Sequence, residues 1–365
     1  MFFLLFSRII PRIKKASIGR DSRKSSRARA PAPHNPAPQK TDTRLGRIAR
    51  LLMDNATVVV SGTKIADEIG TSRSEVWRLV QQLRTLGVEI AGHSATGYRL
   101  KAVPDLLLPD MLAPFLKGTI FGQEIHHYYK IGSTNSEAME SASAGAPEGS
   151  VFVAEEQTAG RGRGAHHWDS APSAGIYCSV VLRPALPPSE ALILSLAAGL
   201  AVQAAVQQVD SRVLPDLKWP NDLVIEGKKF CGILTEMNSE ATRVRYIVVG
   251  IGINVNQAGF PGDLRQAATS LRLATGTEWS RVELCAALLK SLDREYRDLL
   301  QKVGARDSIL ERFQERSSSA RGRQARVEEN GGFEGVTEGL DPRGFLQVRT
   351  AQGVRTVLSG TVRLK

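Results

Sequence analysis

Between residues 150 and 256 the chain alternates apolar runs of strand length with short polar or glycine-rich stretches, and this order narrows the possible folds most. The five runs read SVFVAEEQ, GIYCSVVLRP, LKWPNDLVI, CGILTEMN and RYIVVGIGINVN. Residues 189–209 and 281–300 instead have the length and spacing of helices. We therefore predict an α+β fold in which residues 105–316, after a linker at 104–114, form one mixed α/β domain around a single sheet.

Basic charge is concentrated in the first forty residues. They contain ten Lys or Arg and a single acidic residue, Asp21, so the rest of the chain carries only +2 of the formal net charge of +11. This segment is rich in Arg, Ser, Ala and Pro, a composition that cannot bury enough apolar surface to fold. Residues 1–42 are therefore predicted to be a disordered basic tail, and their charge says little about the folded domains.

Three helices and a hairpin are predicted after the tail. The first helix has apolar residues at helical spacing, and a second, short helix follows over residues 63–69. The third begins after Ser72, which forms a capping box with Glu75. The next stretch, VEIAGHSATGYRL, reads as two strands around a glycine-containing loop. Residues 43–102 are therefore predicted to form a winged helix-turn-helix domain, with the helix-turn-helix at 62–81.

The third predicted helix has a polar face that suits contacts with DNA. Ser74 and Arg78 lie opposite its apolar stripe, and Ser72 and Arg73 lie at its start. We expect these four residues to reach bases or phosphates. The alternative is a small helical module that binds protein, but the order of helix-turn-helix, cap and wing favours DNA. The Arg-rich, Ser-rich and acid-poor tail also fits an organelle transit peptide, but we favour an N-terminal extension or a start assigned too far upstream.

Residues 317–365 contain short strand-like runs separated by glycine turns such as ENGG and DPRG. Strands at this spacing predict a small β-barrel. No apolar run approaches the length that a membrane span needs, and the cysteines Cys178, Cys231 and Cys285 form no C-x-x-C pair. We expect a cytoplasmic protein with buried, reduced cysteines and no membrane partner.

The stretch QTAGRGRGAHHW, residues 157–168, is the leading candidate for a binding site. Glycine lets a backbone approach a ligand closely, and the forked guanidinium groups of Arg161 and Arg163 match carboxylate and phosphate oxygens. The spacing fits neither a Walker loop nor a dinucleotide fingerprint. The sequence therefore predicts an anion-binding loop, with a solvated Gly/Arg turn as the alternative.

Three further motifs supply polar groups at expected strand ends. GSTN, residues 132–135, offers two hydroxyls and an amide to an uncharged polar ligand, although alone it is a common turn or helix cap. KWPND ends on Asp222, a side chain able to hold Mg²⁺. Lys229, in GKKFCG, is a further cation on a turn where lysines are often only solvated, and Asn254 follows the glycines of GIGINVN.

These groups together favour the activation of a carboxylate by a nucleotide. Arg161, Arg163 and Lys229 would bind phosphate and carboxylate oxygens. Trp168 would stack on a flat base, and Asp222 would bind a metal ion. Cations that hold two anions together also stabilise the charge that develops on the α-phosphate. The histidines at 126–127 and 166–167 come in adjacent pairs on expected loops, so no Ser-His-Asp or Cys-His arrangement competes.

The combination of GSTN, QTAGRGRG…W, KWPNDLV, KKFCGILTE and GIGINVN resembles the biotin protein ligases. Because a helix-turn-helix precedes these motifs, the chain is similar to the bifunctional bacterial type that also represses biotin genes. The similarity extends from about residue 45 to the C-terminus, with the five motifs in family order and spacing. It implies an SH3-like barrel over residues 317–365, with ATP and biotin as substrates and Mg²⁺ as a cofactor.

The resemblance also assigns roles to individual residues of the motifs. The residues it implies to be catalytic are Arg161, Lys229 and Asp222, the last orienting either Mg²⁺ or Lys229. Those implied to contact ATP are Arg163, Trp168, Asn221 and Asn254, with the tryptophan packed on adenine. Those implied to bind biotin are Ser133, Thr134, Asn135, Gln157, Arg161, Gly162, Arg163 and Lys229.

The implied reaction has two steps. The biotin carboxylate attacks the α-phosphate of ATP to give biotinyl-5'-adenylate and pyrophosphate, and a lysine of the biotin carboxyl-carrier protein of acetyl-CoA carboxylase then takes the biotin. Bound adenylate would promote a homodimer that binds operator DNA with two half-sites. Two alternatives remain: a biotin-sensing repressor without ligase activity, disfavoured by the cations and Asp222, and a lipoate-type ligase, disfavoured by the GRGRG…W and KWPND loops.

Overall fold

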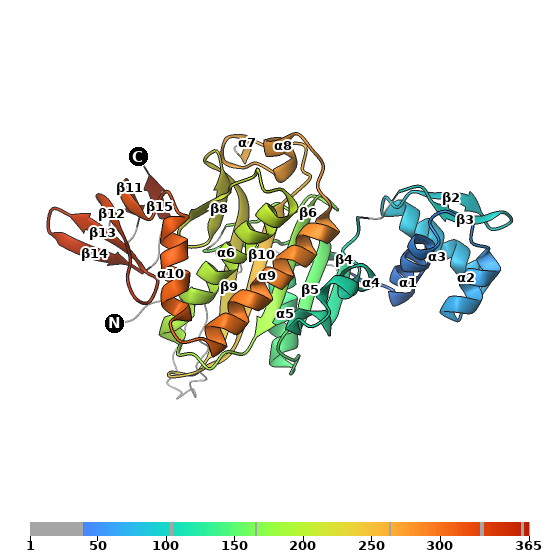
Figure 1. Cartoon of the computed structure of the whole chain (residues 1–365), viewed down its shortest axis with the longest axis horizontal. Helices are drawn as coiled ribbons and strands as arrows, with labels where there is room; N and C mark the ends of the chain where they lie inside the picture. The colour runs from blue at the N-terminus through green and yellow to red at the C-terminus, as the bar shows by residue number, and fades with distance from the viewer. Residues whose placement is uncertain are drawn as a thin grey trace, which may run out of the picture.

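The computed structural model describes residues 39–102, 105–164, 166–262, 264–328, 332–358 and 361–364. These residues form a helical domain, a central α/β domain and a C-terminal sheet, which follow one another along the long axis of the molecule (Figure 1). Residues 1–38 of the predicted basic tail lie outside the described ranges.

The first domain is the expected winged helix-turn-helix. Its elements are α1 (Thr43–Asp54), α2 (Gly62–Ile69), α3 (Arg73–Thr85), β2 (Ile90–His93) and β3 (Gly97–Leu100). The hydroxyl of Ser72 accepts a hydrogen bond from the main-chain N–H of Glu75 at 3.2 Å, so the predicted cap starts α3. Buried side chains at helical spacing, such as Leu45 and Ile48 of α1 and Val76 of α3, pack the three helices together.

The end of the predicted tail is ordered, which corrects the expectation of disorder for residues 39–42. Strand β1 (Gln39–Lys40) pairs antiparallel with β4 (Ile125–Ile131). Asp42 then caps α1 by accepting a hydrogen bond from the N–H of Arg44 at 3.0 Å. Main-chain pairing and a helix cap fix this short stretch, and composition alone reveals neither.

The central domain is built on one eight-stranded sheet with the order β1-β4-β5-β6-β10-β9-β8-β7, in which β4 and β5 run parallel and the other neighbours antiparallel. The strands after β4 are β5 (Val151–Gln157), β6 (Gly175–Leu182), β7 (Asp216–Lys218), β8 (Asp222–Ile225), β9 (Lys228–Ser239) and β10 (Val244–Asn254). All five predicted runs are strands, but LKWPNDLVI is divided into β7 and β8 by the turn at Trp219–Pro220. Strand β4, which carries His126 and His127, lies where a loop was expected.

Helices cover both faces of the sheet (Figure 1). One face is covered by α6 (Leu192–Val209), α9 (Arg281–Gln301) and α10 (Ala305–Glu315), and the other by α5 (Thr134–Ser143). Short helical turns connect the larger elements: α4 (Pro109–Leu112), η1 (Ala113–Leu116), η2 (Ile120–Gly122), η3 (Pro188–Glu190), α7 (Leu264–Ala267) and α8 (Leu271–Thr275). The segment Pro188–Val209 is apolar and long enough to cross a membrane, but 83% of its most apolar window is buried inside the fold, as in a core helix.

The described part of the expected linker is packed rather than free. Leu106, Leu107 and Leu108 are almost completely buried, and Pro109 begins α4. A proline at the first helical position loses no hydrogen bond, so it starts this helix instead of interrupting one. The linker prediction gave the prolines of the segment more weight than its run of three leucines.

The C-terminal domain is a five-stranded antiparallel sheet with the order β14-β13-β12-β11-β15. Its strands are β11 (Arg321–Glu328), β12 (Phe333–Leu340), β13 (Leu346–Thr350), β14 (Gly353–Val357) and β15 (Thr361–Leu364). The sheet agrees with the expected β fold, and its closure into an SH3-like barrel stays a prediction. The indole N–H of Trp219 donates to the carbonyl of Gly344 at 2.9 Å and joins this sheet to the central domain.

A buried ion pair lies where the central domain meets the helix-turn-helix. The guanidinium of Arg281, on α9, is 2.7 Å from the carboxylate of Glu155, on β5, and 3.1 Å from that of Asp105. Burial alone would raise the pKa of Glu155, but the charge of Arg281, the hydrogen bond from His127 and the Leu107 N–H outweigh it. Together they lower the pKa of Glu155 from 4.5 to about 2.

The Glu155 carboxylate is linked to both chain segments that join the helix-turn-helix domain to the central domain, directly to one and through His127 to the other. After that domain, the main-chain N–H of Leu107 donates to Glu155 Oε1 at 3.0 Å. Before it, the hydroxyl of Thr41 lies 2.6 Å from Nδ1 of His127, whose Nε2 is 3.1 Å from Glu155 Oε1. The entry and the exit of the helical domain are therefore fixed at one point of the central sheet.

We predict that Arg281→Met lowers the free energy of unfolding by about 3–5 kcal/mol, because it leaves the Glu155 carboxylate buried without its cation. Lys302→Met, which removes an exposed pair with Asp298 next to the same helix, should cost no more than about 0.5 kcal/mol. Urea unfolding near neutral pH measures both changes.

The pH dependence of stability gives a second readout of the same pair. Because folding lowers the pKa of Glu155, its contribution is complete above the unfolded value of 4.5 and declines as the pH falls toward about 2. The difference between the wild type and Arg281→Met should therefore shrink on acidification. A difference that stays constant between pH 7 and pH 3 would show that the ion pair does not produce it.

Candidate functional site

Most of the predicted ligand-binding residues line one pocket, which lies against β6, β9 and β10 and is open to solvent, with a cavity volume of about 50 Å³. The predicted residues that line it are Ser133, Thr134, Asn135, Gln157, Arg161, Gly162, Arg163, Trp168, Asn221 and Lys229. Asp222 and Asn254 are not among the lining residues. Gly250 and Gly252, the glycines of GIGINVN that were expected to permit close approach of a ligand, also line it. Sequence reasoning did not assign the other lining residues to a site: Tyr177, Cys178, Gly232, Ile233, Leu234 and Ile251.

The GSTN motif places three polar side chains at the start of α5, where all three are buried. Ser133 precedes the helix but makes no side-chain capping bond, so the motif is more than a helix cap. Thr134 donates to the side-chain oxygen of Gln157 through its N–H at 2.8 Å and its hydroxyl at 3.1 Å. A Cβ at Gly250 would lie 1.8 Å from the amide oxygen of Asn135, so this side chain needs a glycine on the neighbouring strand.

The glycine-rich loop folds back on itself as a short hairpin. The N–H of Gly162 donates to the carbonyl of His166 at 2.8 Å, and the N–H of Trp168 donates to the carbonyl of Gly160 at 2.9 Å. Arg163, inside this hairpin, is half-buried and lines the pocket. These two main-chain bonds fix the conformation of the described residues of the loop.

Lys229 and Asp222 form an ion pair at the pocket. The Lys229 ammonium is 2.6 Å from the Asp222 carboxylate and 5.5 Å from the centre of the Trp168 ring. Among the described residues, no group of three or more His, Cys, Asp or Glu side chains is placed to hold a metal ion. Of the two roles expected for Asp222, the geometry favours the orientation of Lys229.

Trp168 packs against strands β9 and β10, where glycine makes room for its ring. A Cβ on Gly232 or Gly252 would lie 2.9 Å or 2.7 Å from an indole carbon. The indole N–H is buried and has no hydrogen-bond partner among the residues that the structure describes. A buried donor without a partner is costly, so it is suited to an acceptor on a bound ligand.

The two predicted asparagines differ in position. Asn221 lines the pocket, and its side chain donates to the carbonyl of Ile233 at 2.8 Å. The amide of Asn254 donates to the Thr269 carbonyl and accepts from the Gln257 side chain, both at 3.1 Å. Asn254 thus fixes the loop after β10, and its contact with ATP stays a prediction.

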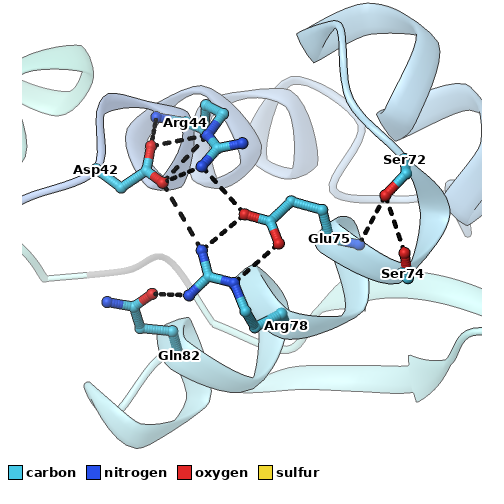
Figure 2. A network of polar contacts seen from close by, with 7 residues as sticks. All are labelled: Asp42, Arg44, Ser72, Ser74, Glu75, Arg78 and Gln82. Atoms are coloured by element: carbon cyan, nitrogen blue, oxygen red, sulfur yellow. Dashed lines mark hydrogen bonds and ion pairs between the residues drawn. The ribbon is translucent and has the colours of Figure 1, made fainter.

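The predicted DNA-binding residues lie at the surface of α3, but one of them is held by acidic neighbours (Figure 2). Arg78 donates to both carboxylate oxygens of Glu75, at 2.7 and 2.9 Å, and lies 3.8 Å from Asp42. Its hydrogen bond lowers the pKa of Glu75, so the pair stays charged. Arg73 instead donates to the carbonyl of Ser94 in the wing at 3.0 Å. Trp77, which sequence reasoning missed, is 49% exposed on the same helix.

Comparisons with known proteins agree with this architecture. Residues 129–254 match the biotin/lipoate A/B protein ligase family, residues 44–99 an HTH domain family, and residues 322–365 the biotin protein ligase C-terminal domain. Over 308 residues the chain is 37% identical to the bifunctional ligase/repressor BirA of Bacillus subtilis, with 84% of this chain and 94% of that protein covered. It is also 36% identical to the biotin–[acetyl-CoA-carboxylase] ligase of Mycobacterium tuberculosis, over 62% of this chain and 83% of the relative.

A solved structure supports the same assignment for the ligase part. The biotin protein ligase from Aquifex aeolicus in complex with biotin and ATP is similar with a TM-score of 0.58 at 28% identity, covering 67% of this chain and 99% of that chain. The pocket and the two flanking domains thus define a ligase of the biotin/lipoate class that carries a DNA-binding domain. The chain belongs to the family of bifunctional biotin protein ligase/repressors.

We predict that Gly252→Ala weakens biotin binding by about tenfold or more, because the new methyl group must displace Trp168 from the pocket. The matched control is Gly259→Ala, where an added Cβ meets nothing within 4 Å. Isothermal titration with biotin measures both variants. Equal affinities would show that the ring position does not affect the pocket.

Proposed function

We propose that this protein joins biotin to ATP as biotinyl-5'-adenylate and then transfers the biotin to a lysine of the biotin carboxyl-carrier protein of acetyl-CoA carboxylase. The observation that carries the proposal is the pocket itself, where Arg161, Arg163 and Lys229 face the same space as buried neutral polar groups. Two anions and one uncharged polar ring system are the ligands that such a pocket suits. Biotin and ATP together have these groups.

Neutral side chains would hold the ureido ring of biotin. A urea has N–H donors and a carbonyl acceptor, which complement the hydroxyls of Ser133 and Thr134 and the amides of Asn135 and Gln157. Hydrogen bonds within the protein, such as those from Thr134 to Gln157 and from Asn135 to Glu236, fix these side chains, so a ligand must match the donors and acceptors that remain. This part of the pocket would therefore supply specificity for biotin, with Gly162 giving the loop a close approach.

The cations would act on the reacting groups. Lys229 and the two loop arginines would hold the biotin carboxylate against the α-phosphate and stabilise the charge that develops as the P–O bond to pyrophosphate breaks. In the second step the amine of the carrier lysine attacks the biotinyl carbonyl, AMP leaves, and the amine loses its proton. Trp168, Asn221 and Asn254 would contact the nucleotide.

Asp222 is the one predicted metal ligand at the pocket, and it would offer a bound Mg²⁺ a single carboxylate, beside its pair with Lys229. When bound, Mg²⁺ would supply neutralisation of the phosphate charge. Asp222 would keep the Lys229 ammonium directed at the oxygens between biotin and the α-phosphate. This role would account for the pairing of Asp222, which does not line the pocket, with Lys229, which lines it and would bind anions there.

We predict that Lys229→Met slows adenylate formation by about a hundredfold, because a preorganised cation is lost at the α-phosphate. The neighbouring exposed Lys228 supplies the control, since Lys228→Met removes an equal charge from the adjacent position, at the start of β9, and should leave the rate within about twofold. The assay follows labelled biotin with MgATP and an apo carrier domain.

The same assay separates the alternatives. Pyrophosphate release with lipoate but not biotin would indicate a lipoate-type ligase. Tight binding of biotin without adenylate or labelled carrier would indicate a sensor that has lost catalysis. Release of pyrophosphate with biotin alone, followed by labelled carrier, supports the proposed ligase.

We also propose that the helix-turn-helix binds operator DNA as a homodimer when the adenylate is bound. The surface positions of Ser72, Arg73, Ser74 and Arg78 at the start of α3 support contacts with bases and phosphates. A two-fold dimer would place two such helices on two half-sites. Both the carrier and the operator place this activity in the cytoplasm rather than at a membrane.

We predict that Arg73→Ala weakens DNA binding about tenfold, whereas Arg50→Ala, on α1 and paired with Asp54, changes it little. Duplexes selected from a randomised pool by the adenylate-bound protein would serve as the ligand, and titration of that pool measures affinity. Equal losses for the two variants would place the DNA contact away from α3.

A further inference from the structure

Glu236 connects three parts of the pocket, although sequence reasoning did not single it out. It lies on β9, and one oxygen of its carboxylate accepts a hydrogen bond from the side-chain amide of Asn135 at 3.1 Å. Its other oxygen pairs with the guanidinium of Arg161. A strand, the GSTN motif and the glycine-rich loop therefore meet at one carboxylate.

The carboxylate approaches Arg161 from outside the pocket. Arg161 lines the pocket, whereas Glu236 is not among the lining residues. The two terminal nitrogens of Arg161 donate to Ser136, at 3.0 Å, and to Glu236. Because a guanidinium has five N–H donors, these contacts leave donors for an anion inside the pocket. Glu236 thus supports the side chain without taking the place of a ligand.

The ion pair is also partly shielded from water. The side chain of Glu236 is 17% exposed and that of Arg161 is 43% exposed. Such a charge-assisted bond is directional, so it fixes the guanidinium and, with it, the hairpin formed by residues 160–164 and 166–168. A second cation of the pocket, Lys229, is paired in the same way with the carboxylate of Asp222.

We propose that Glu236 is a positioning residue that holds Arg161 and its loop over the pocket and thereby sets how long the adenylate stays bound. The inference rests on the proposed ligase function and adds a residue and a kinetic step to it. A reactive mixed anhydride must be kept until the carrier lysine arrives, so the loop that covers it needs support from the protein. Glu236 supplies this support from the sheet.

The test is Glu236→Gln, which keeps an acceptor for Asn135 and removes the charge beside Arg161. We expect adenylate to dissociate about tenfold faster and the KM for biotin to rise, with kcat for adenylate formation changed by less than about threefold. Glu240→Gln is the matched control, since it removes a carboxylate paired with Arg245 just after the end of the same strand and should change neither value. Thermal unfolding of both variants reports their stability.

A double variant separates positioning from general loosening of the fold. In an Arg161→Met background, Glu236→Gln should add no further increase in the dissociation rate, because the ion pair is already removed and glutamine keeps an acceptor for Asn135. Independent, multiplying effects would overturn the proposal. Tighter biotin binding by Glu236→Gln would also overturn it, since it would mean that the carboxylate competes with the ligand for Arg161.

If the wild type forms no adenylate, the proposed ligase function fails. If it does and Glu236→Gln behaves like it, only the role of Glu236 fails.

Discussion

The buried ion pair of Glu155 and Arg281 is the interaction on which the arrangement of the domains depends. Removing two charges from water costs several kcal/mol for each ion, and only close geometry with additional hydrogen bonds offsets that cost. Here one additional bond comes from Leu107, in the segment that leaves the helix-turn-helix domain, and another from His127 of β4, which in turn contacts Thr41 in the segment that enters it. Apolar contacts would let these segments slide, whereas a buried carboxylate accepts hydrogen bonds in few positions. The position of the DNA-binding domain is therefore specified from inside the ligase domain.

The ligand pocket follows a related rule, in which a charge that faces the ligand is supported by an opposite charge behind it. Asp222 supports Lys229 and Glu236 supports Arg161, and neither carboxylate lines the pocket. Preorganised cations avoid the reorganisation that free side chains would need when an anion arrives. The glycines of β9 and β10 complete the site by letting the Trp168 ring approach the sheet closely. Chemistry and packing thus depend on the same two strands.

Sequence patterns predicted the parts of this fold that bury a continuous apolar surface. The predicted strands were confirmed, because long apolar runs have few alternatives. Strand β4 was missed because IHHYYKI contains two histidines and a lysine, and α5 was missed because TNSEAMESAS has a weak apolar face. Most of the pocket residues were identified from motifs, but Glu236 was not, since a glutamate on a strand reads as a solvated position. Its role depends on Arg161, which is 75 residues away in the chain.

The pairing of Arg78 has a consequence for how ions take part in binding DNA. Proteins gain affinity for DNA when their cations displace the counterions condensed on phosphates. The charge of Arg78 is already balanced by Glu75 and lies near Asp42. Binding of Arg78 to a phosphate would therefore release few counterions from the DNA. Trp77, the exposed residue next to Arg78 in the sequence, is uncharged and releases no counterions. Recognition by this helix would then depend more on shape and less on ionic strength than the number of its basic residues implies.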